Sequence, residues 1–448
     1  MNDTIAGIAT SKGVGAISII RVSGEEAISI TNKIFNKDLN KVNTHTIHYG
    51  YIKDNEKIID EVLVTVMRKP KSYTTEDIVE INCHGSISTC ESILQLLIKN
   101  GTRLAEPGEF TKRAFLNGRI DLVEAESIMS LISSTTNKAR DISISQLSGT
   151  ASANIKLLRQ EILDIISLIE VNIDYPEYED ISVLTNEELL PQINNIIKKL
   201  DDILKISHTA RIYTNGIKVG IVGKPNVGKS SLLNALLNED KAIVTSIPGT
   251  TTDIVEGNIK INDLLLQITD TAGIRESTNK IEELGVEKSK QIIHSSELIL
   301  LVLNNNEEFT KEDELLIESI KDKPHIIIIN KIDLEQKLIL PSIYKAIYIS
   351  IENKQGLEEL KQTINNMFNS DNIKTENPTY LTTSRTLGLI EKAKNLLLKS
   401  KHAIKEATPI DIVEIDIKEA WQVLGEITGE YYTTEMIDNI FANFCLGK

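Results

Sequence analysis

One short stretch, residues 223–231, limits most strongly what this chain can fold into. It reads Gly-Lys-Pro-Asn-Val-Gly-Lys-Ser-Ser, follows the apolar run 217–222 and precedes residues 232–237, whose apolar side chains have helical spacing. A strand, a glycine loop and a helix start form the context in which Gly-x-x-x-x-Gly-Lys-Ser/Thr binds phosphates. Gly223 and Gly228 let backbone N–H groups turn toward phosphate oxygens, and the helix N-terminus adds partial positive charge. The stretch therefore predicts a nucleotide-binding α/β unit.

The residue types in this loop match the chemistry of a magnesium-bound nucleotide. The Lys229 ammonium reaches the β- and γ-phosphates, and the Ser230 hydroxyl is a Mg²⁺ ligand. The loop residues expected to contact the nucleotide are Asn226, Val227, Gly228, Lys229, Ser230 and Ser231.

Two further motifs narrow the nucleotide to GTP. Asp270-Thr271-Ala272-Gly273 ends the apolar run 264–269, so Asp270 can support the Mg²⁺ shell and the Gly273 N–H can contact a γ-phosphate. Asn330-Lys331-Ile332-Asp333 ends the run 325–329. A carboxylate at Asp333 accepts both N–H groups of guanine, which adenine lacks. The motif is specific because it follows a strand about 60 residues after Asp-x-x-Gly.

The sequence lacks the water-orienting glutamine that many small GTPases carry after Asp-x-x-Gly. Ile274 occupies that position, and an aliphatic side chain cannot polarise water. Nearby polar candidates are Arg275, Glu276, Glu282, Glu283 and Glu287, and no arginine finger is identifiable. A monovalent cation held by Asn226 and residues 245–250 is one source of the missing positive charge. A threonine of the pair Thr250-Thr251 is expected to complete the Mg²⁺ coordination.

The rest of the chain divides by pattern into three kinds of segment. Up to residue 119, strand-like runs (16–22, 61–66, 77–82) mix with helical spacing (25–35, 88–98), which is typical of an α+β fold. Residues 121–208 and the segment from about 380 onward carry helical stripes. Between them, strands expected at 254–261, 264–269, 298–303, 325–329 and 346–350 alternate with helices, which predicts a doubly wound, mainly parallel sheet. An α/β unit is thus inserted into an all-helical unit.

Composition excludes several classes of function. The 448-residue chain carries a formal net charge of −15, which argues against a general electrostatic grip on nucleic acid or anionic membrane. Three scattered cysteines are too few for a disulfide framework or a zinc site. With no basic leader and no long apolar run, we expect a cytoplasmic protein.

The whole chain resembles the tRNA modification GTPases of the MnmE/TrmE family. The resemblance is carried by the order of the three units and by the C-terminal Cys445-Leu446-Gly447-Lys448. It implies a folate-binding, dimerising N-terminal domain (1–119), a discontinuous helical domain (120–210 plus 375–448) and an inserted G domain (211–374).

The resemblance also assigns roles to individual residues. It implies K⁺ ligands at Asn226, Thr245, Ile247 and Thr250, and Mg²⁺ ligands at Ser230 and Thr251. It makes Glu282 the catalytic glutamate that orients the attacking water. The other implied GTP contacts are Ser246, Pro248, Gly249, Thr271 and Ala272. On the residues alone, Arg21, Glu80 and Arg119 would be solvent-facing charges, but they match, with Lys448, the positions that contact a 5-formyltetrahydrofolate-type ligand. Thr252 and Ser86 depart from the family pattern, in place of an arginine and a glycine.

The implied activity needs partners. The family acts as a homodimer with an FAD- and NADH-using protein of the MnmG/GidA type, in a heterotetramer, and uses 5-formyl- or methylene-tetrahydrofolate to modify C5 of the wobble uridine of tRNA. The alternative is a GTP-dependent assembly switch, for instance in ribosome maturation, without modification chemistry. A third hypothesis, a nucleotide-binding scaffold, predicts no dependence of GTP turnover on Glu282.

Overall fold

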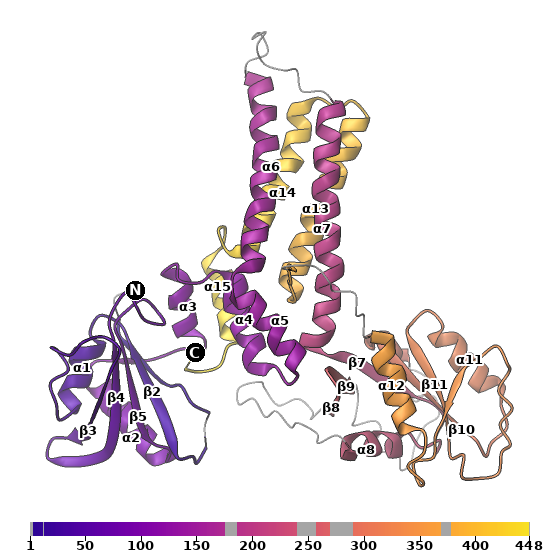
Figure 1. Ribbon diagram of the computed structural model, residues 1–448, viewed down its shortest axis with the longest axis horizontal. Coiled ribbons are helices and arrows are strands. Elements are labelled where there is room, and N and C mark those ends of the chain that lie inside the picture. Colours follow the sequence, from indigo (N-terminus) through magenta and orange to yellow (C-terminus); the bar gives the residue numbers. More distant parts are fainter. Residues whose placement is uncertain are drawn as a thin grey trace.

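The computed structural model describes residues 3–11, 13–174, 186–239, 257–268, 290–368 and 378–447. Figure 1 shows a sheet-containing body at each side of a tall helical bundle, with the C-terminus returning to the N-terminal body. In the described part of the chain, every helix is too short or too polar to cross a membrane. The multidomain fold class predicted from the sequence is confirmed.

The N-terminal body is a six-stranded sheet with two helices on one face. Its strand order is β3-β4-β5-β2-β1-β6, and all neighbours are antiparallel except β1 and β6. The strands are β1 (Ile5–Ile8), β2 (Ile17–Ser23), β3 (Thr46–Asp54), β4 (Lys57–Met67), β5 (Ile78–His84) and β6 (Arg103–Leu104). Side chains alternate between the faces, so Ile20, Val64 and Ile81 pack against α1 (Ala27–Ile34) and α2 (Ile87–Lys99). The opposite face leaves Tyr49 and Leu63 exposed.

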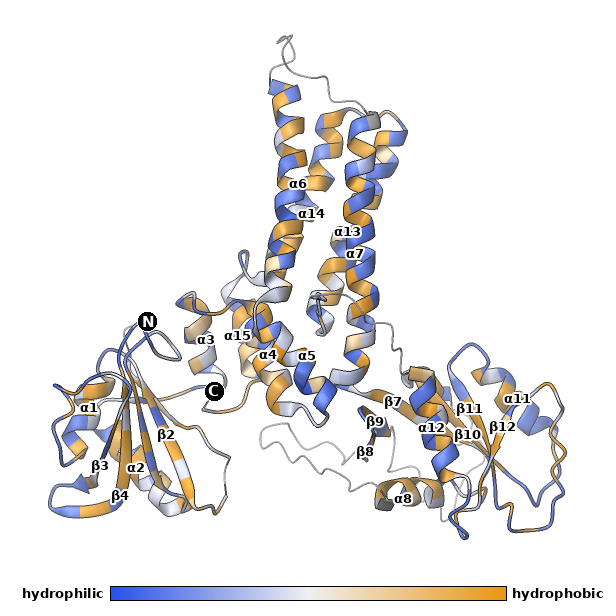
Figure 2. Ribbon diagram, viewed as in Figure 1, coloured by the Kyte–Doolittle hydropathy of each residue, from blue (hydrophilic) through white to orange (hydrophobic). Residues whose placement is uncertain are grey.

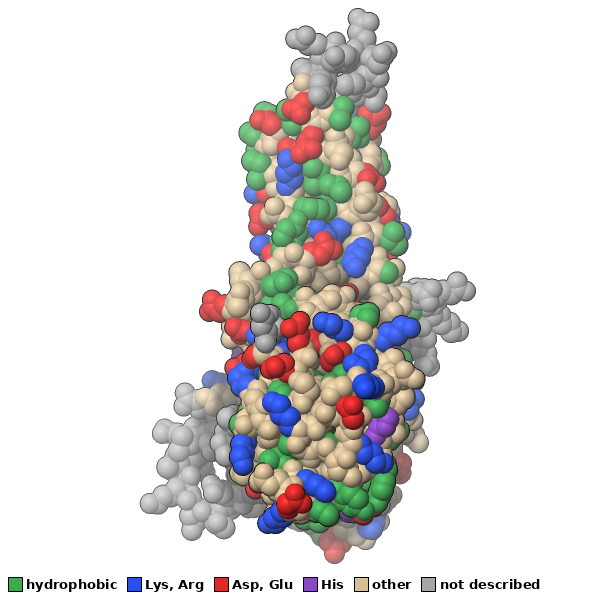
Figure 3. All heavy atoms as spheres, turned by 90° about the vertical axis from the view of Figure 1, so that its left-hand side faces the viewer, with side chains coloured by type: hydrophobic (Ala, Val, Ile, Leu, Met, Phe, Trp, Pro, Cys, Tyr) green, Lys and Arg blue, Asp and Glu red, His purple; other side chains and the backbone are tan. Residues whose placement is uncertain are grey.

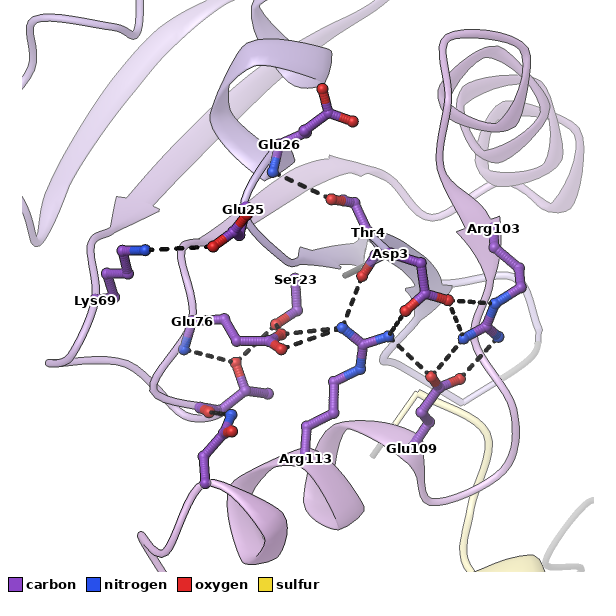
Figure 4. Close-up of polar contacts among 12 residues, drawn as sticks. Asp3, Thr4, Ser23, Glu25, Glu26, Lys69, Glu76, Arg103, Glu109 and Arg113 are labelled. Atoms are coloured by element: carbon purple, nitrogen blue, oxygen red, sulfur yellow. Dashed lines mark hydrogen bonds and ion pairs between the residues drawn. The ribbon is translucent and has the colours of Figure 1, made fainter. Parts of the chain in front are cut away.

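A buried arginine fastens helix α3 (Glu109–Leu116) to this sheet (Figure 4). Arg113 is 1% exposed and its guanidinium lies 2.9 Å from Asp3, 3.0 Å from Glu109 and 3.2 Å from Glu76. Arg103 completes the cluster through Asp3 and Glu109. A buried charge is tolerated only when it is paired, and here three carboxylates surround the guanidinium. The cluster fixes where α3, and the turn that follows it, lie.

The helical stripes predicted within residues 121–208 form the bundle, through apolar residues at 155–169 and 193–204. Those residues share one buried cluster with residues of the C-terminal helices. The helices are α4 (Leu122–Ser133), α5 (Asn137–Leu147), α6 (Thr150–Asp174), α7 (Asn186–Asn215), α13 (Ser384–Lys405), α14 (Ile410–Thr428) and α15 (Thr434–Ala442). Figure 2 shows hydrophobic and hydrophilic residues alternating along α6 and α7, as expected of amphipathic helices.

The inserted body has the predicted, mainly parallel sheet. Its order is β12-β11-β10-β7-β9-β8, and only β8 and β9 are antiparallel. The strands are β7 (Ile217–Val222), β8 (Asn258–Ile261), β9 (Leu264–Ile268), β10 (Leu298–Asn304), β11 (His325–Asn330) and β12 (Ala346–Tyr348). In the described part of the chain, helices α8 (Lys229–Glu239), α11 (Lys311–Ile320) and α12 (Leu357–Phe368) belong to this body. Since β7, β10 and β11 run parallel, the loops after them meet at one edge of the sheet.

Candidate functional site

The loop after β7 adopts a backbone conformation that only certain residues allow. Gly228 has φ +99°, and a Cβ there would lie 2.2 Å from Asn330 Nδ2. A Cβ on Gly223 would lie 2.3 Å from the Val302 carbonyl oxygen. Asn226 has φ +60°, in the left-handed region that asparagine tolerates better than most residues, and its side chain is exposed. The loop can adopt this conformation because the two positions where neighbouring atoms leave no room for a Cβ are both glycines.

Lys229 closes across this loop. Its Nζ donates hydrogen bonds to the carbonyl oxygens of Gly223, at 2.8 Å, and Lys224, at 2.7 Å. Burial lowers the pKa of Lys229 from its usual value, because the charged form is disfavoured away from water. A phosphate group would give this ammonium a charged acceptor in place of neutral carbonyls, and charge-assisted hydrogen bonds are the stronger ones. The geometry therefore fits nucleotide phosphates.

The motif after β11 is attached directly to the phosphate loop. Asn330 is 2% exposed, and its Nδ2 donates to the Val227 carbonyl oxygen at 2.9 Å. Its Oδ1 is buried and has no hydrogen-bond partner among the described residues. Lys331 Nζ donates to the Asn226 carbonyl oxygen at 2.8 Å. The phosphate loop and the Asn-Lys-x-Asp motif thus form one unit.

A serine orients the carboxylate expected to recognise guanine. Ser350 is fully buried, and its Oγ donates to Asp333 Oδ1 at 2.5 Å. The same Oγ accepts a hydrogen bond from the Asn353 N–H at 3.2 Å. Although Ile351 and Glu352 depart from the usual Ser-Ala-Lys, Ser350 holds Asp333 with its other carboxylate edge available for a base.

A buried ion pair connects the phosphate loop to helix α11, and it was not predicted from the sequence. Lys224 Nζ lies 2.6 Å from Asp313 Oδ2 and also donates to Thr310 Oγ1, at the N-terminus of α11. Only 13% and 5% of the Lys224 and Asp313 side chains are exposed. Asp313 also accepts from the Thr310 N–H in the capping box of α11. The signal that could have found it is the Thr-x-x-Asp capping box next to a strand end.

Several predicted nucleotide-site residues lie outside the described residues. They are the contact residues Thr245, Ser246, Ile247, Pro248, Gly249, Thr250, Thr251, Asp270, Thr271, Ala272 and Gly273, together with the catalytic candidate Glu282. Lys448 lies outside them too.

A second set of predicted residues gathers on the uncovered face of the N-terminal sheet. Arg21 and Glu80 are paired across β2 and β5, and Arg21 Nε donates to Glu80 Oε1 at 2.9 Å. The Arg21 guanidinium carbon lies 5.2 Å from the ring centre of Tyr73 and 5.5 Å from that of Phe110. Arg21 Nη1 also donates to the Gly447 carbonyl oxygen at 3.4 Å. The C-terminal tail therefore reaches the candidate folate residues.

Tyr73 joins this pair to the third predicted residue. The Arg119 guanidinium carbon lies 4.6 Å from the Tyr73 ring centre, on a side chain that is otherwise exposed. The Tyr73 hydroxyl and Thr111 Oγ1 of α3 are hydrogen-bonded at 2.9 Å. Cation–π contacts of this length are attractive. Tyr73 was missed because one tyrosine in a loop carries no sequence signal for a partner.

Comparisons with known proteins show which family the chain belongs to. Residues 4–119 match the family described as "GTP-binding protein TrmE N-terminus", and residues 122–445 match "MnmE helical domain". The protein named tRNA modification GTPase MnmE of Levilactobacillus brevis is 47% identical over 100% of this chain and 98% of its own length. The protein of the same name from Bacillus cytotoxicus is 46% identical over 100% and 99%.

One solved structure that is similar to this chain covers only part of it. The structure of Era in complex with MgGDPNP and nucleotides 1506–1542 of 16S ribosomal RNA is 30% identical and covers 40% of this chain and 66% of its own. Its TM-score of 0.26 is too low to place any residue by superposition. The relatives, in contrast, match from end to end. The chain therefore belongs to the MnmE/TrmE family of GTP-hydrolysing, tRNA-modifying enzymes.

Proposed function

We propose that this enzyme is a K⁺-activated GTPase that modifies C5 of the wobble uridine, U34, of certain tRNAs. The reaction adds an aminomethyl or carboxymethylaminomethyl group, uses a one-carbon unit from 5-formyl- or methylene-tetrahydrofolate, and takes place with an FAD- and NADH-dependent partner of the MnmG/GidA type. The observation that carries the proposal is that Arg21, which is paired with Glu80, and Arg119 both contact Tyr73, next to the C-terminal tail.

The chemistry of that cluster suits a folate. A folate combines a flat, hydrogen-bonding ring with a carboxylate-bearing tail. Arginine binds carboxylates and stacks on flat rings, and Glu80 supplies an acceptor for ring N–H groups. The proposed folate residues are Arg21, Glu80, Arg119 and Lys448, with Tyr73 between the two arginines. In this proposal Gly447 places the terminal Lys448 at the site.

In the G domain, we propose that Ser230 and Thr251 bind Mg²⁺ and that Glu282 orients the attacking water. The proposed K⁺ ligands are Asn226, Thr245, Ile247 and Thr250. The exposed Asn226 side chain in the phosphate loop supports this assignment. K⁺ would supply positive charge near the phosphates. GTP turnover measured in matched KCl and NaCl buffers tests it, and equal rates would contradict it.

We further propose a homodimer and the domain boundaries 1–119, 120–210 plus 375–448, and 211–374. The exposed Tyr49 and Leu63 on the uncovered sheet face support dimerisation through the N-terminal domain. Separate buried clusters in the three bodies support the boundaries. Ala210 and Tyr213 at the end of α7 pack into the core of the inserted body. Helix α7 of the helical domain therefore contacts the G domain next to β7, its first strand.

Folate binding is the decisive test. Titration with 5-formyltetrahydrofolate should show binding by the wild type, and Arg119→Ala should weaken it at least tenfold. Arg140→Ala is the control, because Arg140 is an exposed arginine of α5 paired only locally with Asp141. No binding by the wild type would favour the assembly switch. Nucleoside analysis of tRNA from a strain lacking the protein should show the loss of the U34 modification.

A further inference from the structure

A cavity of about 480 Å³ lies where the N-terminal body meets the bundle. It is lined by the end of α3, the turn into α4, the first turns of α6 and the segment after α14 (Figure 1). Arg119 lines it, so the cavity opens next to the candidate folate residues without containing Arg21, Glu80 or Tyr73.

Two of the lining side chains are cations, and both lie close enough to the Glu124 carboxylate to oppose the rise in its pKa that burial causes. Arg119 and Lys156 are both exposed, and within the described part of the chain neither side chain makes a hydrogen bond or an ion pair. The two lining carboxylates are engaged differently. Asp121 and Glu124 form the capping box of α4, where each accepts a backbone N–H of the other. The lining thus carries two cations and two carboxylates, and the carboxylates are held by backbone N–H groups while Lys156 can turn toward a ligand.

The α6 side of the cavity adds hydrogen-bond donors. Helix α6 has 25 residues and no acidic residue in its first turn, so its N-terminal N–H groups and dipole favour an anion. Ser152 lines the cavity from this turn, is 3% exposed, and its hydroxyl has no hydrogen-bond partner among the described residues. Lys156 stands four residues further on, hence on the same side of the helix. A buried hydroxyl without a partner is the kind of group that a ligand satisfies.

An aromatic wall faces these groups. Tyr432 is 46% exposed, lines the cavity, and its ring packs edge-to-face on that of Phe115 with centres 5.3 Å apart. Figure 3, which shows the N-terminal side, has Lys and Arg interspersed with Asp and Glu over the whole face. A nucleic acid would need a local site on such a surface.

We propose that this cavity binds one nucleotide of the tRNA, with its phosphate at Lys156 and the N-terminus of α6 and its base against Tyr432, while Arg119 at its edge faces the folate site. Base stacking on an aromatic ring together with cation contacts to the phosphate is how proteins hold unpaired nucleotides. The inference rests on the tRNA modification just proposed. It adds where the RNA enters, beside the folate residues.

The test uses the full chain and a synthetic anticodon stem-loop RNA with uridine at the wobble position. Lys156→Glu reverses one charge, and Ala153→Trp fills the cavity from an exposed helical position that lines it. Each should weaken RNA binding about tenfold, and Lys156→Glu should lower the slope of log affinity against log salt by about one. Lys198→Glu is the matched control, an exposed lysine on α7 outside the cavity. Thermal unfolding checks that all three variants are folded.

The outcomes separate this inference from the proposed function. Unchanged folate affinity in both variants with weakened RNA binding supports the nucleotide site. RNA binding equal to the wild type in both variants would overturn it, even where folate binding and tRNA modification hold. Loss of 5-formyltetrahydrofolate binding instead would also overturn it, because the anion would then be a folate carboxylate. A wild type that binds folate but no RNA contradicts the site and leaves the folate assignment standing.

Discussion

Lys331 Nζ donates a hydrogen bond of 2.8 Å to the backbone carbonyl of Asn226, which ties the base-recognition motif to the phosphate loop. Both residues have positive φ, +65° and +60°. Together with the bond from Asn330 to the Val227 carbonyl, this contact makes the loop depend on the motif for its shape. A change in either motif should therefore alter affinity for the whole nucleotide.

Gly228→Ala should show how closely the two motifs fit. The added Cβ would lie 2.2 Å from Asn330 Nδ2, at a residue with φ +99°. We expect affinity for a fluorescent GDP analogue to fall more than tenfold and the free energy of unfolding to fall by about 2 kcal/mol, since left-handed backbone and overpacking both cost. Gly388→Ala is the control, because Gly388 lies in α13 and a Cβ added there would meet no other atom within 4 Å. This variant should raise the free energy of unfolding by about 0.5–1 kcal/mol, since alanine favours the helix more than glycine does. Equal nucleotide affinity and equal stability of the two variants would show that the two motifs are not closely packed at Gly228.

The pair formed by Lys224 and Asp313 should be strongly coupled. Lys224→Met leaves a carboxylate that is 5% exposed without its cation, and breaking a buried pair costs about 3–5 kcal/mol. The double variant with Asp313→Asn should recover part of this loss, because no unpaired charge remains. Urea unfolding of the single and double variants measures the coupling. Additive losses would show that the pair does not act as a unit.

Acidification should weaken the anchor of α3 through Glu109. Burial alone raises the pKa of Glu109, but hydrogen bonds from Arg103, the Glu106 N–H and Arg113 outweigh it, so the pKa lies below the ordinary 4.5. A carboxyl whose pKa is depressed by folding stabilises the fold above its unfolded pKa, and this contribution is lost as the pH falls through the folded value.

Glu109→Gln tests this dependence. The variant should be less stable than the wild type at pH 7. The difference between their unfolding temperatures should become smaller as the pH drops below about 4.5. Glu91→Gln, at an exposed position of α2, is the control and should follow the wild type at every pH. Thermal unfolding midpoints across pH 3–7 provide the measurement. A constant gap would mean that the charge of Glu109 adds nothing to the anchor.

The strands that the sequence predicted are those with a local signature. β10 is buried at all seven positions and β11 ends in a motif, so both read as apolar runs. β1 has only four residues, and the apolar pattern of β3 is interrupted by His48 and Gly50, so neither was predicted. β1 also pairs with β6, where Ile5 lies opposite Arg103, and the information for that pairing lies in the distant partner strand and not in β1 itself.

For the candidate sites too, contiguous motifs could be predicted from the sequence, and contacts between distant residues could not. The phosphate loop and the Asn-Lys-x-Asp motif are contiguous, so their chemistry is visible in the sequence. Arg21 and Glu80 looked like two solvent-facing charges until the pairing of β2 with β5 placed them opposite each other. Lys224 and Asp313 lie 89 residues apart and meet only because the strands before them are neighbours. Only the resemblance to a family had selected Arg21, Glu80 and Arg119.

Gly447→Ala should release the C-terminal tail from the N-terminal body. Gly447 has φ +88°, and a Cβ there would lie 2.1 Å from the Ile8 carbonyl oxygen, so the tail cannot keep its place on β1. Arg21 would then lose its contact with the Gly447 carbonyl, and we expect 5-formyltetrahydrofolate affinity to fall about tenfold or more while GTP turnover stays unchanged. Leu446→Ala is the control, because Leu446 is 39% exposed in the same tail. Isothermal titration of both variants decides: folate binding by Gly447→Ala at wild-type affinity would show that the tail is not part of the site.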